Sequence, residues 1–111
     1  MIRIENSSKQ EIKTIIEAQK VFFRRGETLD LDFRLQALRA LKTAILKWEK
    51  CIAEALWLDL HKSYEEAYLT ELSIVLGEID NHLRHLKLWM SPKPVGTPIK
   101  MMPSRSKVIA E

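Results

Sequence analysis

One side chain of this sequence could act as a strong nucleophile, the thiol of its single cysteine, Cys51. A reactive thiol requires a lowered pKa, which a histidine, a metal or a helix start can provide. None of these accompanies Cys51 in the sequence, although Lys47 and Lys50 are close along the chain. We therefore predict an unreactive, half-buried helix cysteine beside Trp48 and Ile52.

Glu78, His82 and His85 have a spacing that could bring metal ligands together, because positions three and four apart share a helix face. The Glu-x-x-His pair of di-iron bundles is absent, since Asn81 is the third residue after Glu78. We predict surface or boundary histidines here. His61 is expected to serve the last carbonyl groups of a helix.

The aromatic side chains are not interleaved with basic clusters, as stacking platforms for nucleic-acid bases would be. We expect core and boundary packing for Trp48, Trp57, Trp89, Tyr64 and Tyr68. No glycine-rich phosphate loop of the G-x-G-x-x-G or G-x-x-x-x-G-K-[ST] type is present. The sequence thus predicts no catalytic, cofactor-binding or metal-binding residue in this chain.

The composition is that of one small, helix-rich unit. The 111 residues are 46% hydrophobic and 30% charged, with three glycines and four prolines, and this length permits one domain. No apolar run approaches the roughly 18 residues of a membrane span, and the first eleven residues do not resemble a signal peptide. A single cysteine is typical of a reducing compartment, so we expect a cytoplasmic protein.

The net charge of +3 comes from the end of the chain. Residues 1–90 carry 14 basic and 14 acidic side chains, whereas residues 91–111 carry four basic side chains against Glu111. A body of balanced charge lacks the one-sided basic face that phosphate binding requires. We therefore expect no nucleic-acid partner.

Residues 1–90 are predicted to form an N-terminal helical region that begins with a short amphipathic helix. Ser8 and Glu11 have the spacing of a capping box, which starts a helix. Gly26 is placed to end this helix in a left-handed conformation. The apolar face consists of Ile12, Ile15, Ile16, Phe22 and Phe23.

A second helix is predicted to begin at Asp30 or Asp32 and to reach Leu60. Thirty residues is long against an average of about 11 or 12, so we expect a bend or break near Trp48–Lys50, with Cys51–Leu60 as a separate short helix. The expected inward stripe is Leu35, Leu38, Leu41, Ile45, Trp48, Ile52 and Leu56.

A third helix is predicted from Tyr64 to Met90. Ser63 and Glu66 form a second capping box, and Pro92 stops the helix. The apolar spacing alternates between three and four, which indicates one continuous α-helix. Its stripe is Leu69, Leu72, Leu76, Ile79, Leu83, Leu86 and Met90.

All four prolines lie after residue 91, so residues 91–111 are predicted to form an extended arm. Thr97–Met102 and Lys107–Ala110 are expected to be the strands of a β-hairpin around a turn at residues 103–106. An isolated hairpin is marginal in water and its edges need covering. The predicted fold class is therefore mainly α, with antiparallel helices and a C-terminal extended β-hairpin arm that requires a partner.

Three segments together resemble the amino-terminal helical region of class 3-type aldehyde dehydrogenases: Phe33–Leu38, Ile52–Ser63 and Glu66–Glu71. Later segments are similar to the stretch that leads into the dinucleotide-binding fold of that family: Glu78–Asp80, His85–Met90, Pro92–Lys93 and Ser104–Glu111. The resemblance runs from about Lys9 to the end of the chain, but it covers only a minority of a full-length enzyme.

This resemblance implies an α/β aldehyde dehydrogenase fold for the parent enzyme. It also implies NAD(P)-dependent oxidation of an aldehyde to a carboxylic acid, through a cysteine thiohemiacetal and hydride transfer to the nicotinamide. The catalytic cysteine, general-base glutamate, oxyanion asparagine and glycine-containing coenzyme turn of the family have no counterpart in this chain, and Cys51 does not match the catalytic motif. The segment alone should therefore bind no NAD or NADP and be inactive.

The resemblance further implies two partners, the remainder of the enzyme chain and a second subunit. Residues 97–111 would belong to a bridging hairpin through which the enzyme forms a homodimer. The family often has glycine where His61 stands, which affects a helix end and leaves the chemistry untouched.

The alternative is a free-standing helical protein-interaction module with a basic docking tail. The unpartnered arm favours it, and the neutral charge of residues 1–90 weakens it. The reading frame after Glu111 distinguishes the two, since a Pro-x-Gly turn and an apolar strand favour the enzyme and a stop codon favours the module.

Overall fold

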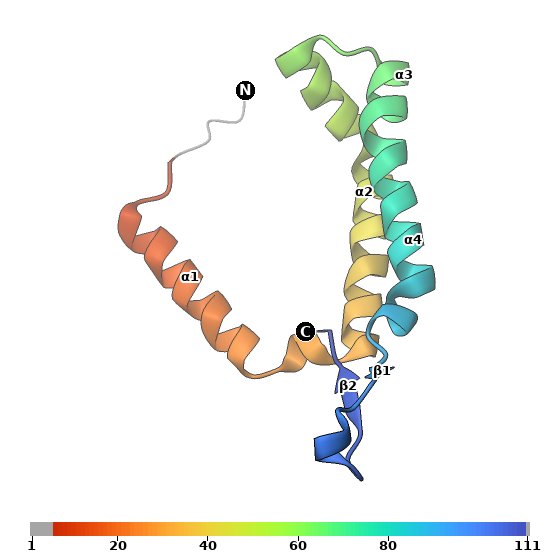
Figure 1. Ribbon diagram of the computed structural model, residues 1–111. Coiled ribbons are helices and arrows are strands. Elements are labelled where there is room, and N and C mark those ends of the chain that lie inside the picture. Colours follow the sequence, from red (N-terminus) through yellow and green to blue (C-terminus); the bar gives the residue numbers. More distant parts are fainter. Residues whose placement is uncertain (1–5, 111) are drawn as a thin grey trace.

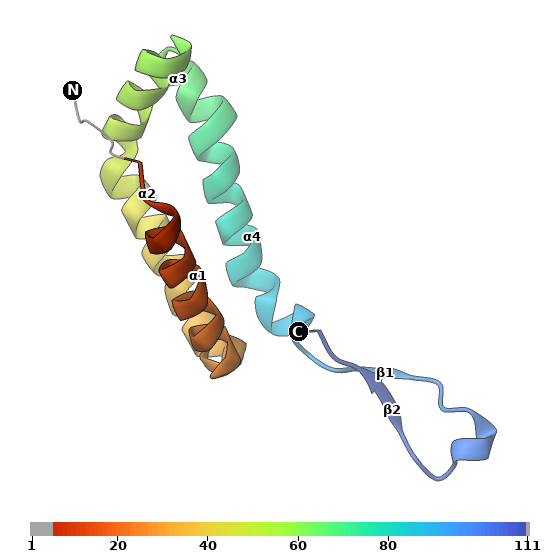
Figure 2. The same cartoon turned by 90° about the vertical axis from the view of Figure 1, so that its left-hand side faces the viewer.

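The computed structural model describes residues 6–110, which form a helical body and a two-stranded antiparallel hairpin (Figures 1 and 2). This is the mainly α fold class that the sequence predicts. The helices are α1, Lys9–Arg24; α2, Leu31–Leu60; α3, Tyr64–Ala67; and α4, Ser73–Trp89. The strands are β1, Lys93–Val95, and β2, Ser106–Val108.

Helix α1 begins and ends as predicted. The Ser8 backbone N–H donates to Glu11 Oε2 at 2.6 Å, and the Glu11 N–H donates to Ser8 Oγ at 3.2 Å, which completes the capping box. Gly26 adopts φ +74°, the left-handed conformation that a glycine favours. Among the described residues, α1 contacts the 3-10 turn Glu27–Leu29 but does not pack along α2 or α4.

Helix α2 is a single α-helix of 30 residues, so the prediction that Cys51–Leu60 forms a separate helix is wrong. Asp30 caps it by accepting a hydrogen bond from the Phe33 N–H at 2.8 Å. No glycine or proline interrupts its hydrogen bonds. The helix axis nevertheless changes direction toward the C-terminal end of α2 (Figure 1), in agreement with the prediction of a bend.

The inward stripe predicted for α2 is wrong at two of its members, Leu41 and Trp48, which are 49% and 54% exposed. The face toward α4 is marked by Lys42, whose Nζ lies 2.6 Å from Asp80 Oδ1. Because successive helix residues are about 100° apart, Leu41 projects well away from that face. The 30-residue helix therefore carries a second apolar face.

The helix that follows is not one continuous α-helix, because the π-helical turn Tyr68–Leu72 separates α3 from α4. Ala67 is completely buried and the next buried position is Leu72, five residues later, whereas Leu69 is 65% exposed. A π turn contains one residue more than an α-helical turn. Apolar positions spaced three and four residues apart therefore do not all lie on the buried face of the helix at this turn. The prediction that Leu69 belongs to the buried stripe is therefore wrong.

Short caps shape the connection between α2 and α3. His61 adopts φ +54° and its backbone N–H donates to the Trp57 carbonyl oxygen at 2.9 Å, which closes the end of α2. Ser63 Oγ accepts from the Glu66 N–H at 3.2 Å, but the return bond that would complete the predicted capping box is not formed. Helices α2 and α4 thus run antiparallel (Figure 2).

The hairpin forms, but its first strand is displaced from the predicted position. Strand β1 pairs with β2, with Pro94 opposite Lys107. The predicted strand Thr97–Met102 is wrong, because Ile99–Met101 forms a 3-10 turn in which the Met101 N–H donates to the Pro98 carbonyl at 2.8 Å. The predicted second strand overlaps β2. Glu111 lies outside the described residues.

The buried core of residues 6–110 is very small, and its members are Ala53, Ala67, Leu72 and Ile79. The radius of gyration is 20.7 Å, whereas a compact chain of this length has about 13 Å. The alanines permit close approach of α2 and the α3–α4 helix, while most large apolar side chains stay in contact with solvent.

Replacing His61 with glycine should stabilise the chain by about 0.5–1 kcal/mol, because a left-handed helix end costs glycine less than a residue with a Cβ. Thermal unfolding followed by circular dichroism measures this change. His61→Ala is the control, since it keeps the Cβ and loses the ring contact with Trp57. A His61→Gly variant no more stable than His61→Ala would contradict the account.

Candidate functional site

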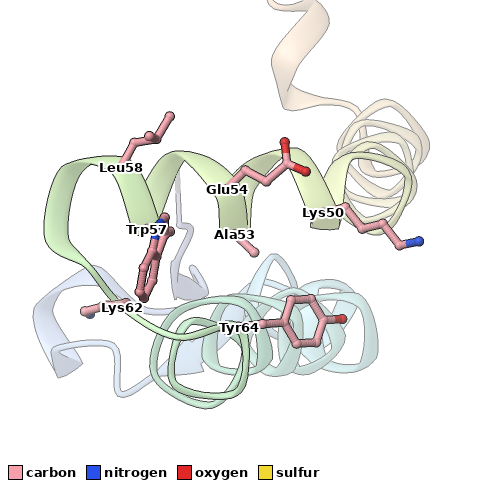
Figure 3. A pocket seen from close by; sticks show the side chains of 7 residues that line it. All are labelled: Lys50, Ala53, Glu54, Trp57, Leu58, Lys62 and Tyr64. Atoms are coloured by element: carbon pink, nitrogen blue, oxygen red, sulfur yellow. The ribbon is translucent and has the colours of Figure 1, made fainter.

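A groove lies between the C-terminal part of α2 and the start of α3, with a volume of about 640 Å³. Figure 3 shows Trp57 and Lys62 at one end and Tyr64 at the other, with Ala53 above the space between them. The remaining lining residues are Lys50, Glu54 and Leu58. The bend of α2 and the His61 cap position this groove.

Two polar side chains of the groove, Lys62 and Tyr64, are engaged in structural contacts. Lys62 Nζ lies 2.5 Å from Glu71 Oε1 and ties the loop after α2 to the π turn. The Tyr64 hydroxyl donates to Glu49 Oε1 across the opposite end. This hydrogen bond raises the pKa of Tyr64 above its ordinary value of 10.0, because ionisation would place a phenolate beside the Glu49 carboxylate.

The groove holds no arrangement for catalysis within the described residues. Its charged side chains are Lys50, Glu54 and Lys62, and none is paired with a nucleophile in the manner of an activated serine or cysteine. Cys51 lies on α2 and lines a different, smaller depression with Trp48 and Tyr64. Cys51 is exposed rather than half-buried as predicted.

The predicted histidine positions form an aromatic cluster. The Nδ1 atoms of His82 and His85 lie 2.8 and 2.9 Å from the backbone oxygens of Glu78 and Asn81, respectively. Both rings contact Trp89, His82 edge-on at 5.1 Å and His85 stacked at 5.7 Å between centroids. The seven-residue spacing of His82 and Trp89 could have indicated this contact. Residues 6–110 contain no group of three potential metal ligands.

The aromatic residues expected in the core are more exposed than predicted. Exposed fractions range from 39% to 54% for Tyr68, Trp89, Tyr64, Trp57 and Trp48. The described helices include none that is long and apolar enough to cross a bilayer.

Comparison with known proteins gives the family of this segment. No family model matches the chain. It is 40% identical over 92 residues to 4,4'-diaponeurosporen-aldehyde dehydrogenase of Staphylococcus aureus, covering 83% of this chain and 20% of the relative. It is also 40% identical over 87 residues to aldehyde dehydrogenase family 3 member A2 of Macaca fascicularis, covering 78% of this chain and 17% of the relative.

A solved structure, the substrate-bound state of Staphylococcus aureus AldH, matches with a TM-score of 0.84 and 38% identity. The match covers 88% of this chain and 21% of that chain. This chain thus spans about a fifth of the length of the relatives it matches. It belongs to the aldehyde dehydrogenases, family 3 members among its relatives, and matches their amino-terminal segment. The family resemblance predicted from the sequence is confirmed.

The Tyr64 phenol should titrate above its ordinary value of 10.0, and Glu49→Gln should lower its midpoint. Because the folded-state pKa is raised, the stabilising contribution of this contact is present below pH 10 and is lost as the pH rises through the folded-state value. Phenolate absorbance in a Tyr68→Phe background isolates Tyr64. A midpoint unaffected by Glu49→Gln would show that the contact does not form.

Proposed function

We propose that this chain is the amino-terminal segment of an NAD(P)-dependent aldehyde dehydrogenase that oxidises an aldehyde to a carboxylic acid. In this proposal the segment supplies scaffold and subunit contact and takes no part in the chemistry. The observation that carries it is the solved dehydrogenase whose chain has the same fold over 88% of this sequence at 38% identity. Identity this high over a matching fold indicates common descent.

The exposed surface supports a role within a larger polypeptide. Large apolar side chains are exposed on every helix of more than one turn, for example Phe23, Trp57 and Leu88 at 66%, 53% and 65%. An exposed apolar surface of this extent is typical of an interface. It also fits a free-standing interaction module, but the dehydrogenase relatives favour the enzyme.

The coenzyme would be NAD or NADP, bound by the intact enzyme. One relative is named a dimeric NADP-preferring aldehyde dehydrogenase, from Canis lupus familiaris, at 38% identity over 85 residues. The described residues offer no phosphate-binding turn, so we assign coenzyme binding to the remainder of the enzyme. The single, unpaired Cys51 supports a cytoplasmic location.

We also propose that residues 97–111 contact a partner subunit. Each strand of the hairpin has one strand neighbour, so both outer edges carry backbone groups that can pair with another chain. The tip exposes Ile99, Met101 and Met102 at 86%, 63% and 66%. The canine relative is named as dimeric, which supports a subunit partner.

The protein translated from the complete reading frame should reduce NAD or NADP when an aldehyde is added, and the 111-residue chain alone should not. Absorbance of the reduced nicotinamide at 340 nm measures both. Cys51→Ser in the complete protein is the control and should keep its activity, because the Cys51 thiol takes no part in the proposed reaction. Loss of turnover in Cys51→Ser, or turnover by the isolated chain, would contradict the proposal.

Deleting residues 97–110 from the complete protein should convert a dimer into a monomer, because β2 and the apolar tip are removed together and β1 loses its strand partner. Light scattering coupled to size-exclusion chromatography measures the mass. Circular dichroism controls for folding, and helical signal should persist since the deletion spares α1 to α4. A folded variant of unchanged mass would exclude the arm as the dimer contact.

A further inference from the structure

Helices α1 and α2 diverge from the turn after Gly26 (Figure 1), and both carry exposed apolar side chains. Within residues 6–110 the two helices meet at one end, where the Phe22 and Phe33 rings lie 6.0 Å apart. Beyond this point α1 does not pack along α2. The shape is that of a clamp, closed near Phe22 and open toward Ser8.

The apolar face of α1 is turned toward α2. Phe22 contacts Phe33, and Phe23 lines a depression with Phe33 and Leu86. Ile15 and Ile16 lie seven residues, or two helical turns, before these two phenylalanines and therefore share their face of the helix. All four side chains are exposed.

Helix α2 presents a second apolar face on the side of α1. Leu41 lies eight residues after Phe33, and Trp48 lies fifteen after it, so all three fall on one face at 100° per residue. Ala37, Ala40 and Ala44 lie between them on the same face. Leu41 and Trp48 lie on this face, and they therefore point away from the contact with α4.

We infer that these two faces, the α1–α2 clamp, hold an apolar segment that follows in the same polypeptide. The clamp is defined by Ile12, Ile15, Ile16, Phe33, Leu41 and Trp48. The inference rests on the proposed function, because it needs a polypeptide longer than this chain. It deepens that proposal by naming the surface through which the segment joins the rest of the enzyme.

The comparison with the solved dehydrogenase supports this occupant. The solved dehydrogenase matches 88% of this chain with a TM-score of 0.84, so the helical segment has a counterpart in that protein. The matched part is only 21% of that chain, and the remaining polypeptide is available to fill the clamp. Helices of this length draw most of their stability from packing of an amphipathic face, so an uncovered α1 would be poorly stabilised.

The charge on α1 specifies the chemistry of the occupant. Lys9, Lys13, Lys20 and Arg24 fall within about 60° of one another around the helix and form a stripe beside Ile16. Within this stripe, Lys20 pairs with Glu17 at 2.9 Å. The segment held by the clamp should therefore combine an apolar face with carboxylates that meet the stripe.

Two leucines of α2 provide a matched test in the complete protein, because Leu41 and Leu46 are both 49% exposed here. Leu41 lies in the clamp, and Leu46 projects about 140° away from it. Leu41→Ala should lower the Tm by about 5 °C or more, as a buried leucine does, and Leu46→Ala by about 2 °C or less. Ile16→Ala, on the opposite wall, should behave like Leu41→Ala.

Hydrogen exchange on unmutated protein provides a second measurement that does not depend on any variant folding. Amides of α1 should exchange at least about 100-fold more slowly in the complete protein than in the 111-residue chain. Equal Tm losses for Leu41→Ala and Leu46→Ala, or α1 amides unprotected in the complete protein, would overturn the inference.

Two other occupants have their own signatures, each of which would also overturn it. Protection of α1 that arises only with vesicles of anionic phosphatidylglycerol would indicate a membrane surface. Protection that rises with protein concentration would indicate a second copy. The nicotinamide assay on the same preparation separates the two proposals, because an inactive protein with a protected α1 refutes the dehydrogenase activity and leaves the clamp intact.

Discussion

The helices of this chain bury only a small part of their apolar surface against one another, and the rest of the structure follows from this constraint. The buried core of the described residues consists of two alanines, one leucine and one isoleucine. Burial of apolar surface is the main favourable contribution to folding, and here most of that surface is left on the outside. This supports the proposal that the chain forms one layer of a larger core, and the match to about a fifth of an aldehyde dehydrogenase agrees with it.

The contact that organises the helical body is the close approach of α2 and the helix that begins at α3. Ala53 and Ala67 permit this approach, and the π turn after Ala67 brings Leu72 back to the same face. The Lys42–Asp80 and Lys62–Glu71 ion pairs lie at separate points along the contact between these helices. Small side chains therefore set the spacing of the helices, while the large ones remain available for other polypeptide segments.

The sequence was sufficient to predict features that depend on local chemistry. Ser8, Gly26 and Asp30 cap or end helices as expected, because a cap is a contact within one turn of the chain. The family was also predicted correctly from short runs of residues.

The π turn could not be predicted from the sequence, because Leu69 continues a regular apolar spacing and nothing local reveals the extra residue. Leu41 and Trp48 were assigned to the wrong face for a related reason: one long helix carries two apolar faces, and spacing alone does not separate them. The first strand was misplaced because the apolar run Ile99–Met102 follows Pro98, which starts a 3-10 turn.

We propose that later parts of the same polypeptide cover the exposed apolar faces of this segment. Hydroxyl-radical labelling of side chains, read by mass spectrometry in the isolated chain and in the complete protein, tests it most directly. The account predicts that labelling of Ile12, Leu41 and Trp48 falls several-fold in the complete protein while labelling of Val21, on the opposite side of α1, changes little. Equal labelling of all four residues in the two proteins would contradict it.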